Sequence, residues 1–282
     1  MTIKSKARRR PATSISKRPT IALLTDFGLT DHYVGVMKGV LASKNPDVRI
    51  IDISHEVQPH SVHEAGYLLW ASYRYFPQGT IFVVVVDPGV GSNRNILIFK
   101  SASYVFLAPD NGVLNFVEFE EKNVRCYELG MEKVRLLSKS GVLSKNISST
   151  FQGRDVFAPI AAILSLGERP DRFGELKERP SLSSPFYDVS GSSNMGRVLH
   201  VDRFGNIVTN IRGEESGSAG RIKEIVISGR RIDRWVKCYS EAPEETPVLI
   251  LGSNGLTEIS LKNAHAGRVL DARPGLPVRV IK

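Results

Sequence analysis

The chain has 282 residues, of which 41% are hydrophobic and 24% are charged, so it can form one large domain or two ordinary ones. No apolar run approaches the roughly 18 residues that a membrane-spanning helix needs. The net charge of +9 would suggest a nucleic-acid partner, but seven basic residues lie within residues 1–20, which contain no acid. The rest of the chain is nearly neutral, which argues against nucleic acid as a partner. Because the sequence has no long apolar run, no membrane association is expected either.

Residues 1–19 form a basic tail, which we expect to be a disordered extension. Weak nucleic-acid contact and organelle targeting are the alternatives for this tail. Cys126 and Cys238 are far apart and belong to no CxxC motif, so no metal site is predicted. A reducing cytoplasm is the expected location.

From Thr20 onward, strand and helix patterns alternate. The predicted strands are Ile21–Thr25, Val48–Ile53, Ile81–Val86, Ile96–Phe99 and Tyr104–Leu107. One helix is predicted to begin with Thr30 as its cap, a second with a capping box of Ser61 and Glu64, and a third spans Asp155–Leu166. This succession predicts an α/β domain with a mostly parallel sheet over residues 20–185.

A cluster of Pro, Ser, Gly and Asn between about Glu178 and Met195 predicts a linker. The runs beyond it are short, rich in β-forming residues and separated by turn residues. The predicted strands are Arg197–Val201, Ile207–Ile211, Ile222–Ile227, Val248–Leu251, Glu258–Leu261 and Val278–Ile281. The second predicted domain, residues 192–282, is therefore a small all-β sandwich or barrel.

Three polar loops follow strands or precede a helix, where α/β sheets gather their ligands: residues 26–31, 87–94 and 150–155. Each could be only a turn, and Arg154 with Asp155 could be a structural ion pair. The loop at 87–94 lacks the Lys-Ser/Thr of a P-loop and the GxGxxG order. The residues alone therefore predict a small-ligand pocket and no particular reaction.

Five ordered motifs make the chain resemble the S-adenosyl-L-methionine (SAM) hydroxide adenosyltransferase family, which shares its fold with the SAM-dependent fluorinase and chlorinase. They are TDFGLTDHYVGVMKG, FPQGTIFVVVVDPGVGSNR, LAPDNGVL, TFQGRDVFAP and VDRFGNIVTNI. The resemblance runs from about Thr20 to the C-terminus. It implies an α/β domain followed by a β-barrel-like domain, and a homotrimer that holds SAM between the N-terminal domain of one subunit and the C-terminal domain of its neighbour.

The resemblance also implies roles for individual residues. Asp26 matches the acid that holds the ribose hydroxyls. Asp87 and Arg94 match two members of an Asp-Arg-His set that positions the attacking water or hydroxide. The remaining matches are to residues that contact methionine or adenine or that form an apolar wall: Asp202, Phe204, Asn206, Ser253, Asn263 and Ala264.

One position departs from the family pattern. Gln152 stands where the family has the His of TFHGRD, and the sequence has no histidine between His63 and His200. A glutamine amide can position water but cannot accept a proton near neutrality. Gln152 is thus either a tolerated third catalytic residue or the sign of a non-catalytic or weakly active SAM- or adenosine-binding protein.

The activity implied is hydrolysis of SAM to adenosine and methionine, with SAM as substrate and no cofactor. Because the sulfonium is already an activated leaving group, the site has only to align water opposite sulfur and exclude solvent. A halogenase is the nearest enzymatic alternative. The halogenases carry Tyr at the position of Asp87, and the fluorinase has Ser at the position of Gly153.

Overall fold

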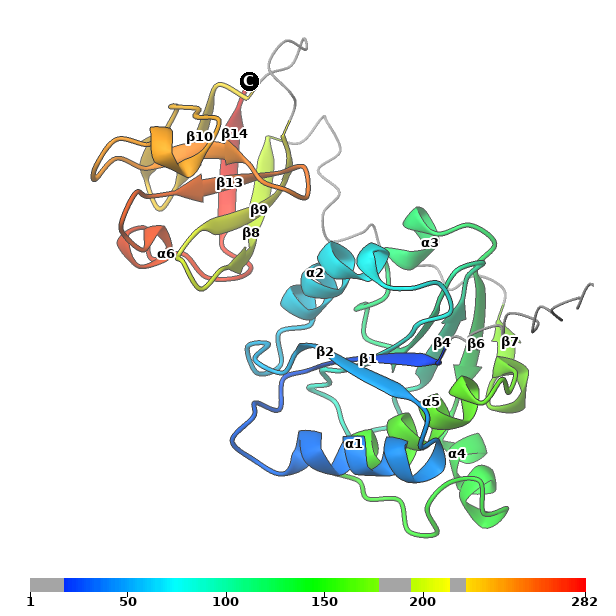
Figure 1. The fold of residues 1–282 in the computed structure, drawn as a ribbon. Helices are drawn as coiled ribbons and strands as arrows, with labels where there is room; N and C mark the ends of the chain where they lie inside the picture. Colours follow the sequence, from blue (N-terminus) through cyan, green and yellow to red (C-terminus); the bar gives the residue numbers. More distant parts are fainter. Residues whose placement is uncertain (1–17, 178–193, 214–221) are drawn as a thin grey trace, which may run out of the picture.

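The computed structural model describes residues 18–177, 194–213 and 222–282. Within these ranges the chain forms two seven-stranded sheets, one before residue 178 and one after residue 193 (Figure 1). The architecture is mixed α/β, as predicted. Residues 1–17 of the basic tail and most of the predicted linker lie outside the described residues. Among the described residues, no helix has both the length and the apolar composition required to cross a bilayer.

The first sheet has the strand order β2-β1-β3-β5-β4-β6-β7. Its strands are β1 (Thr20–Thr25), β2 (Arg49–Ser54), β3 (Ile81–Val85), β4 (Ile96–Lys100), β5 (Val105–Pro109), β6 (Arg125–Leu129) and β7 (Glu175–Lys177). The first four strands in this order run parallel, because helices carry the chain back over the sheet between β1, β2 and β3. A short turn joins β4 to β5, so these two strands are antiparallel.

Helices cover both faces of this sheet (Figure 1). They are α1 (Tyr33–Lys44), α2 (Val62–Ser72), α3 (Val117–Glu120), α4 (Met131–Lys139) and α5 (Ala158–Ser165). Alternate residues of β1 serve the two layers: Ile21 and Leu23 pack in the core with α1 and α5, whereas Ala22 and Leu24 pack in the core with α2. The sheet is therefore buried on both sides, as the all-apolar β3 predicted.

The second sheet is antiparallel, with the order β11-β10-β14-β8-β9-β13-β12. Its elements are β8 (Met195–Val201), β9 (Ile207–Arg212), β10 (Glu224–Ile227), β11 (Arg230–Ile232), β12 (Val248–Leu251), β13 (Leu256–Ser260), β14 (Pro277–Ile281) and the short helix α6 (Ala266–Val269). Just after β11, the Arg234 carbonyl accepts a hydrogen bond from Leu249 N at 2.8 Å, and Val236 N donates to Leu249 O at 3.0 Å. These bonds join the two edges of the sheet and give it a barrel-like form.

Helix α2 packs against both sheets. Leu199, Val208 and Leu256 of the second sheet belong to the same buried cluster as residues of α2. At this contact, Glu64 Oε1 lies 2.6 Å from His200 Nδ1, and the ring of Tyr67 stacks on that of His200. A polar pair inside an apolar cluster fixes the position of β8 on α2.

Two capping predictions were wrong. Helix α1 begins after His32, so Thr30 does not cap it. Ser61 precedes α2 but its side chain makes no capping bond, and Glu64 instead accepts from Gln58 N and contacts His200. A tertiary partner has taken the carboxylate that local spacing assigned to the helix end. The helix predicted from Asp155 begins at Ala158, after a π-helical turn over Gly153–Phe157.

Candidate active site

The carboxyl ends of β1 and β3 and the segment before α5 surround a cavity of about 280 Å³, which we call the Asp87 cavity. β1 and β3 are parallel neighbours with Thr25 opposite Val85, so the residues after both strands meet at one edge of the sheet. Asp26, Asp87 and Gln152 all line this cavity. The structure thus brings together side chains from all three loops that the sequence singled out.

The carboxylate of Asp87 is held on one side only, and its side chain is 7% exposed. Oδ1 accepts a hydrogen bond from Gly89 N at 2.8 Å. It also lies 3.1 Å from Arg94 Nε, which makes an ion pair, but the N–H is not aligned for a hydrogen bond. Arg94 is fixed by a second contact, since Nη1 donates to the carbonyl of Asp110 at 3.2 Å. No described residue hydrogen-bonds to Asp87 Oδ2, so this oxygen is available to a bound molecule.

Close packing explains the glycines of the loop that carries Asp87. A Cβ at Gly89 would lie 2.3 Å from Arg94 Nη2, so any side chain there would displace the guanidinium. Gly91 has a φ of +81°, and a Cβ there would lie 2.4 Å from the carbonyl oxygen of Ser149. Both glycines allow the ion pair and the neighbouring loop to approach this backbone closely.

Asn111 supports the site, although the sequence alone assigned it no role. Its Nδ2 donates at 2.8 Å to the carbonyl of Val86, the residue before Asp87. The preceding residue, Asp110, provides the carbonyl that holds Arg94, and burial together with the nearby Glu128 carboxylate raises the pKa of its own side chain. The LAPDNGVL motif, quoted only for its resemblance, was the signal that could have identified this support.

Gln152 is buried, with 5% of its surface exposed, and immediately precedes the π-helical turn. Its Nε2 lies 3.9 Å from the Sδ of Met131. A thioether sulfur is only a weak hydrogen-bond acceptor. A Cβ at the next residue, Gly153, would lie 3.1 Å from the Sδ of Met37. The catalytic role assigned to Gln152 stays a prediction, but its burial in the wall of the Asp87 cavity fits that role.

Arg154 and Asp155 form the structural ion pair that the sequence allowed. Two hydrogen bonds of 2.7 and 2.8 Å join the guanidinium to the carboxylate, which also accepts from Ser148 N at 2.8 Å. Burial would raise the pKa of Asp155, but these hydrogen bonds and the nearby positive charge outweigh it and lower the pKa. This pair anchors the segment on which Gln152 lies.

Three aromatic rings form an apolar wall of the Asp87 cavity: Phe27, Tyr33 and Phe151. Their ring centroids are 5.0 to 6.0 Å apart, with tilted or edge-to-face geometry. Tyr33, the first residue of α1, lines the cavity and is 38% exposed. Asp26 lies beside this wall, and its Oδ2 accepts from His60 N at 2.9 Å.

The predicted residues of the C-terminal domain form a separate group around the turn between β8 and β9. Asp202 accepts from Phe204 N at 2.9 Å and Asn206 N at 2.8 Å through Oδ1, and from Asn206 Nδ2 at 2.9 Å through Oδ2. Asn206 is buried, whereas Phe204 projects from the turn with 80% of its surface exposed. The Asp202 carboxylate thus stiffens a turn that presents an aromatic ring outward.

The other predicted residues of this domain are more dispersed. Ser253 lines a different cavity, of about 210 Å³, together with Trp70 and other residues of the α2 segment. Asn263, with a φ of 54°, and Ala264 are both exposed between β13 and α6. The lining of the Asp87 cavity comes from residues 26–153, so the two groups of predicted residues do not share this cavity within one chain.

The sequence has similar, named relatives along nearly its whole length. It is 33% identical over 262 residues to the (R)-S-adenosyl-L-methionine hydrolase of Thermus thermophilus, covering 93% of this chain and 99% of the relative. A protein of the same name from Methanocaldococcus jannaschii is 33% identical and is covered over 91% of its length. A fluorinase of an Actinoplanes species is 26% identical, with 94% of this chain and 98% of the relative covered.

Solved structures and domain families agree with these relatives. An uncharacterized conserved protein of Thermotoga maritima has a TM-score of 0.78 at 32% identity, with 93% of this chain and 100% of the other covered. A conserved hypothetical protein of Thermus thermophilus has a TM-score of 0.74 at 31% identity, with the same coverage. The sequence pattern of the SAM hydroxide adenosyltransferase N-terminal domain matches residues 21–174, and that of the C-terminal domain matches residues 196–279. The chain therefore belongs to the SAM hydroxide adenosyltransferase family.

Proposed function

We propose that this protein is an enzyme that hydrolyses S-adenosyl-L-methionine to adenosine and L-methionine. The observation that carries the proposal is the nearly buried Asp87 carboxylate, which has Arg94 beside one oxygen and the other oxygen unoccupied by protein donors. The names of the relatives from Thermus thermophilus and Methanocaldococcus jannaschii support the same reaction.

The reaction requires a positioned water and little else. The water oxygen forms a bond to the ribose 5′ carbon while the bond from that carbon to sulfur breaks, and the electron pair of that bond stays on sulfur. Methionine leaves as a neutral thioether, so no general acid is needed. The proton of the attacking water passes to solvent or to a nearby acceptor, and no cofactor takes part.

The described residues fit these requirements. The unoccupied oxygen of Asp87 would orient the water, and the guanidinium of Arg94 would stabilise hydroxide character on it. Gln152, from the opposite loop, would complete the positioning through its amide. Asp26 would accept hydrogen bonds from the ribose hydroxyls, and the neighbouring aromatic wall would pack against the adenosine part of the substrate.

We further propose that the complete site lies between two copies of the chain, in a homotrimer. A volume of about 280 Å³ lies below the range of roughly 300–1,000 Å³ that ligand pockets usually occupy. An exposed aromatic residue on a stiffened turn, Phe204, is suited to closing such a cavity on a neighbouring subunit. Asp202 and Asn206 would then bind the amino and carboxylate groups of methionine, with Ser253, Asn263 and Ala264 contributing at the rim.

Two alternatives are less well supported. For a halogenase, a carboxylate beside the nucleophile would repel a halide, and the packing of Met37 leaves little room for a side chain at Gly153. For a non-catalytic SAM-binding protein, the only argument is Gln152, and the ion pair of Asp87 with Arg94 is intact without it.

Incubation of the purified protein with SAM tests the proposal, with adenosine and methionine separated and quantified by chromatography. We expect the two products in equal amounts, matching enzyme-dependent loss of SAM. Binding of SAM without any product would reject the hydrolase in favour of a binding protein.

A further inference from the structure

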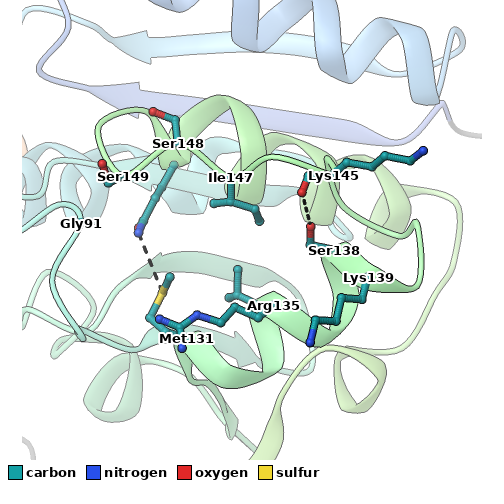
Figure 2. A pocket seen from close by; sticks show the side chains of 11 residues that line it. Gly91, Met131, Arg135, Ser138, Lys139, Lys145, Ile147, Ser148 and Ser149 are labelled. Atoms are coloured by element: carbon teal, nitrogen blue, oxygen red, sulfur yellow. Dashed lines mark hydrogen bonds between the residues drawn. The ribbon is translucent and has the colours of Figure 1, made fainter.

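A second cavity, of about 410 Å³, lies between α4 and residues 145–149, and we call it the α4 cavity (Figure 2). Gln152 lines both this cavity and the Asp87 cavity. Figure 2 shows Met131, Arg135 and Lys139 on one wall, with Ile147 and Ser148 on the facing segment. Nothing in the proposed hydrolysis of SAM uses this second cavity.

Positive charge dominates the titratable side chains around the α4 cavity. Arg135 and Lys139 lie four residues apart on α4, so both face the same side of the helix, whereas the side chain of Lys145 on the facing segment extends away from the cavity (Figure 2). No residue in the described part of the chain forms an ion pair with any of these three. Two cations of one helix, Arg135 and Lys139, have no ion-pair partner among the described residues, so they give this cavity a positive potential that attracts anions.

A buried amide adds a directed donor to this charge. Gln152 is 5% exposed, and its Nε2 has the thioether sulfur of Met131 as a partner at 3.9 Å. Sulfur is a poor substitute for an oxygen acceptor, so this N–H group can exchange the contact for a stronger hydrogen bond to an oxyanion.

The walls of the cavity are held in place before any ligand binds. Ser138 Oγ donates to the carbonyls of Ser144 and Lys145, at 2.6 and 3.0 Å, which ties the loop after α4 back to the helix. On the facing segment, Asp155 accepts from Ser148 N, and Gly91 fits closely against the Ser149 carbonyl. A preformed cavity loses little conformational entropy when it binds a ligand.

We propose that the α4 cavity is a binding site for a small phosphate-bearing anion. Arg135 would bind two phosphate oxygens through its planar guanidinium, and Lys139 would neutralise part of the remaining charge. The Gln152 amide would donate to a third oxygen. A phosphate group matches this arrangement because it offers several oxygens and up to two negative charges within a small volume.

Calorimetric titration of the full chain with inorganic pyrophosphate, at constant ionic strength and without SAM, tests the proposal. We expect saturable binding that Arg135→Ala and Lys139→Ala each weaken roughly tenfold, the loss typical of one charge-assisted hydrogen bond. Lys133→Ala is the matched control, since Lys133 lies on the same helix outside the lining of the cavity. The control should bind like the wild type.

Each other outcome would overturn the proposal. Absence of saturable binding would show that the cavity is not an anion site. An equal loss in Lys133→Ala would show general attraction to a basic surface. Equal affinity for citrate, a tricarboxylate, would reject the assignment to phosphate. Because the titration contains no SAM, none of these results depends on whether the protein hydrolyses it.

Discussion

The functional argument rests on how individual side chains are held. Asp87 lines the cavity and is constrained through one carboxylate oxygen, by Gly89 and Arg94, while no described residue hydrogen-bonds to the other oxygen. Gln152 reaches the same cavity from a different loop. These two positions make separate predictions, since one carries a charge and the other only an amide dipole.

Replacing Asp87 by Asn should separate charge from shape. The amide oxygen can still accept from Gly89 N, so the loop should persist, but the negative charge beside the attacking water is lost. We expect turnover to fall by about 10²-fold or more, the scale at which single groups contribute to catalysis, while the affinity for SAM changes little. Single-turnover kinetics and calorimetry measure the two effects, and a variant with near wild-type turnover would remove Asp87 from the site.

Gln152→His tests whether a proton acceptor at this position is useful. If a base here accelerates hydrolysis, the variant should turn over at least tenfold faster than the wild type near and above neutral pH, within the range known for general bases. An unchanged rate across that pH range would mean that the residue only orients water, and that glutamine does so adequately.

At the scale of elements, the sequence predicted the strands well and the helix ends poorly. The apolar run at Ile81–Val86 identified β3 because a strand covered on both faces has no polar alternation. The capping box at Ser61 failed because Glu64 contacts His200, which lies far along the chain and is invisible to local spacing. Helix α4, with its basic face, was not predicted at all, and neither were β6, β7 and β11.

In the candidate site, too, the sequence predicted what depends on neighbouring residues and missed what depends on tertiary contacts. The position of Asp26 and Asp87 at strand ends predicted that they would meet, because β1 and β3 are parallel neighbours. The support from Asn111 and the aromatic wall required the folded structure, since both depend on loops packed together from distant parts of the sequence.

The π-helical turn and its ion pair give a pH-dependent prediction at this scale. The pKa of Asp155 is lowered in the folded protein below its ordinary value of 3.8, so its stabilising contribution exists above that value and is lost as the pH falls through the folded pKa. Asp155→Asn should therefore lower the free energy of unfolding near neutral pH, by about 1–3 kcal/mol for the loss of its charged hydrogen bonds.

Urea unfolding of wild type and variant at neutral and acidic pH measures this difference. The two proteins should converge in stability once the wild-type carboxylate is protonated. A difference that is equally large in acid would mean that packing, and not the charge of Asp155, holds the turn.

At the scale of the whole molecule, the two groups of predicted site residues lie on different sheets and do not share the Asp87 cavity within one chain. The proposed homotrimer resolves this separation by pairing the cavity of one copy with the Asp202 turn of the next. Such a head-to-tail interface closes into a ring when the rotation between copies is one third of a turn.

Mixed subunits test the shared site. Chains carrying Asp87→Asn and chains carrying Phe204→Ala should each be impaired alone, yet their co-expressed mixture should regain activity. With random assembly, about a quarter of the interfaces pair an intact cavity with an intact turn, so about a quarter of the wild-type activity should return. Activity no greater than that of the separate variants would place the whole site within one chain.

The central claim is that water attacks the ribose 5′ carbon of SAM, and the fate of the water oxygen tests it most directly. The reaction is run in water labelled with the heavy oxygen isotope, and the products are analysed by mass spectrometry. The account predicts one labelled oxygen in adenosine and none in methionine. Adenosine without the label, or release of adenine or methylthioadenosine in place of adenosine, would contradict it.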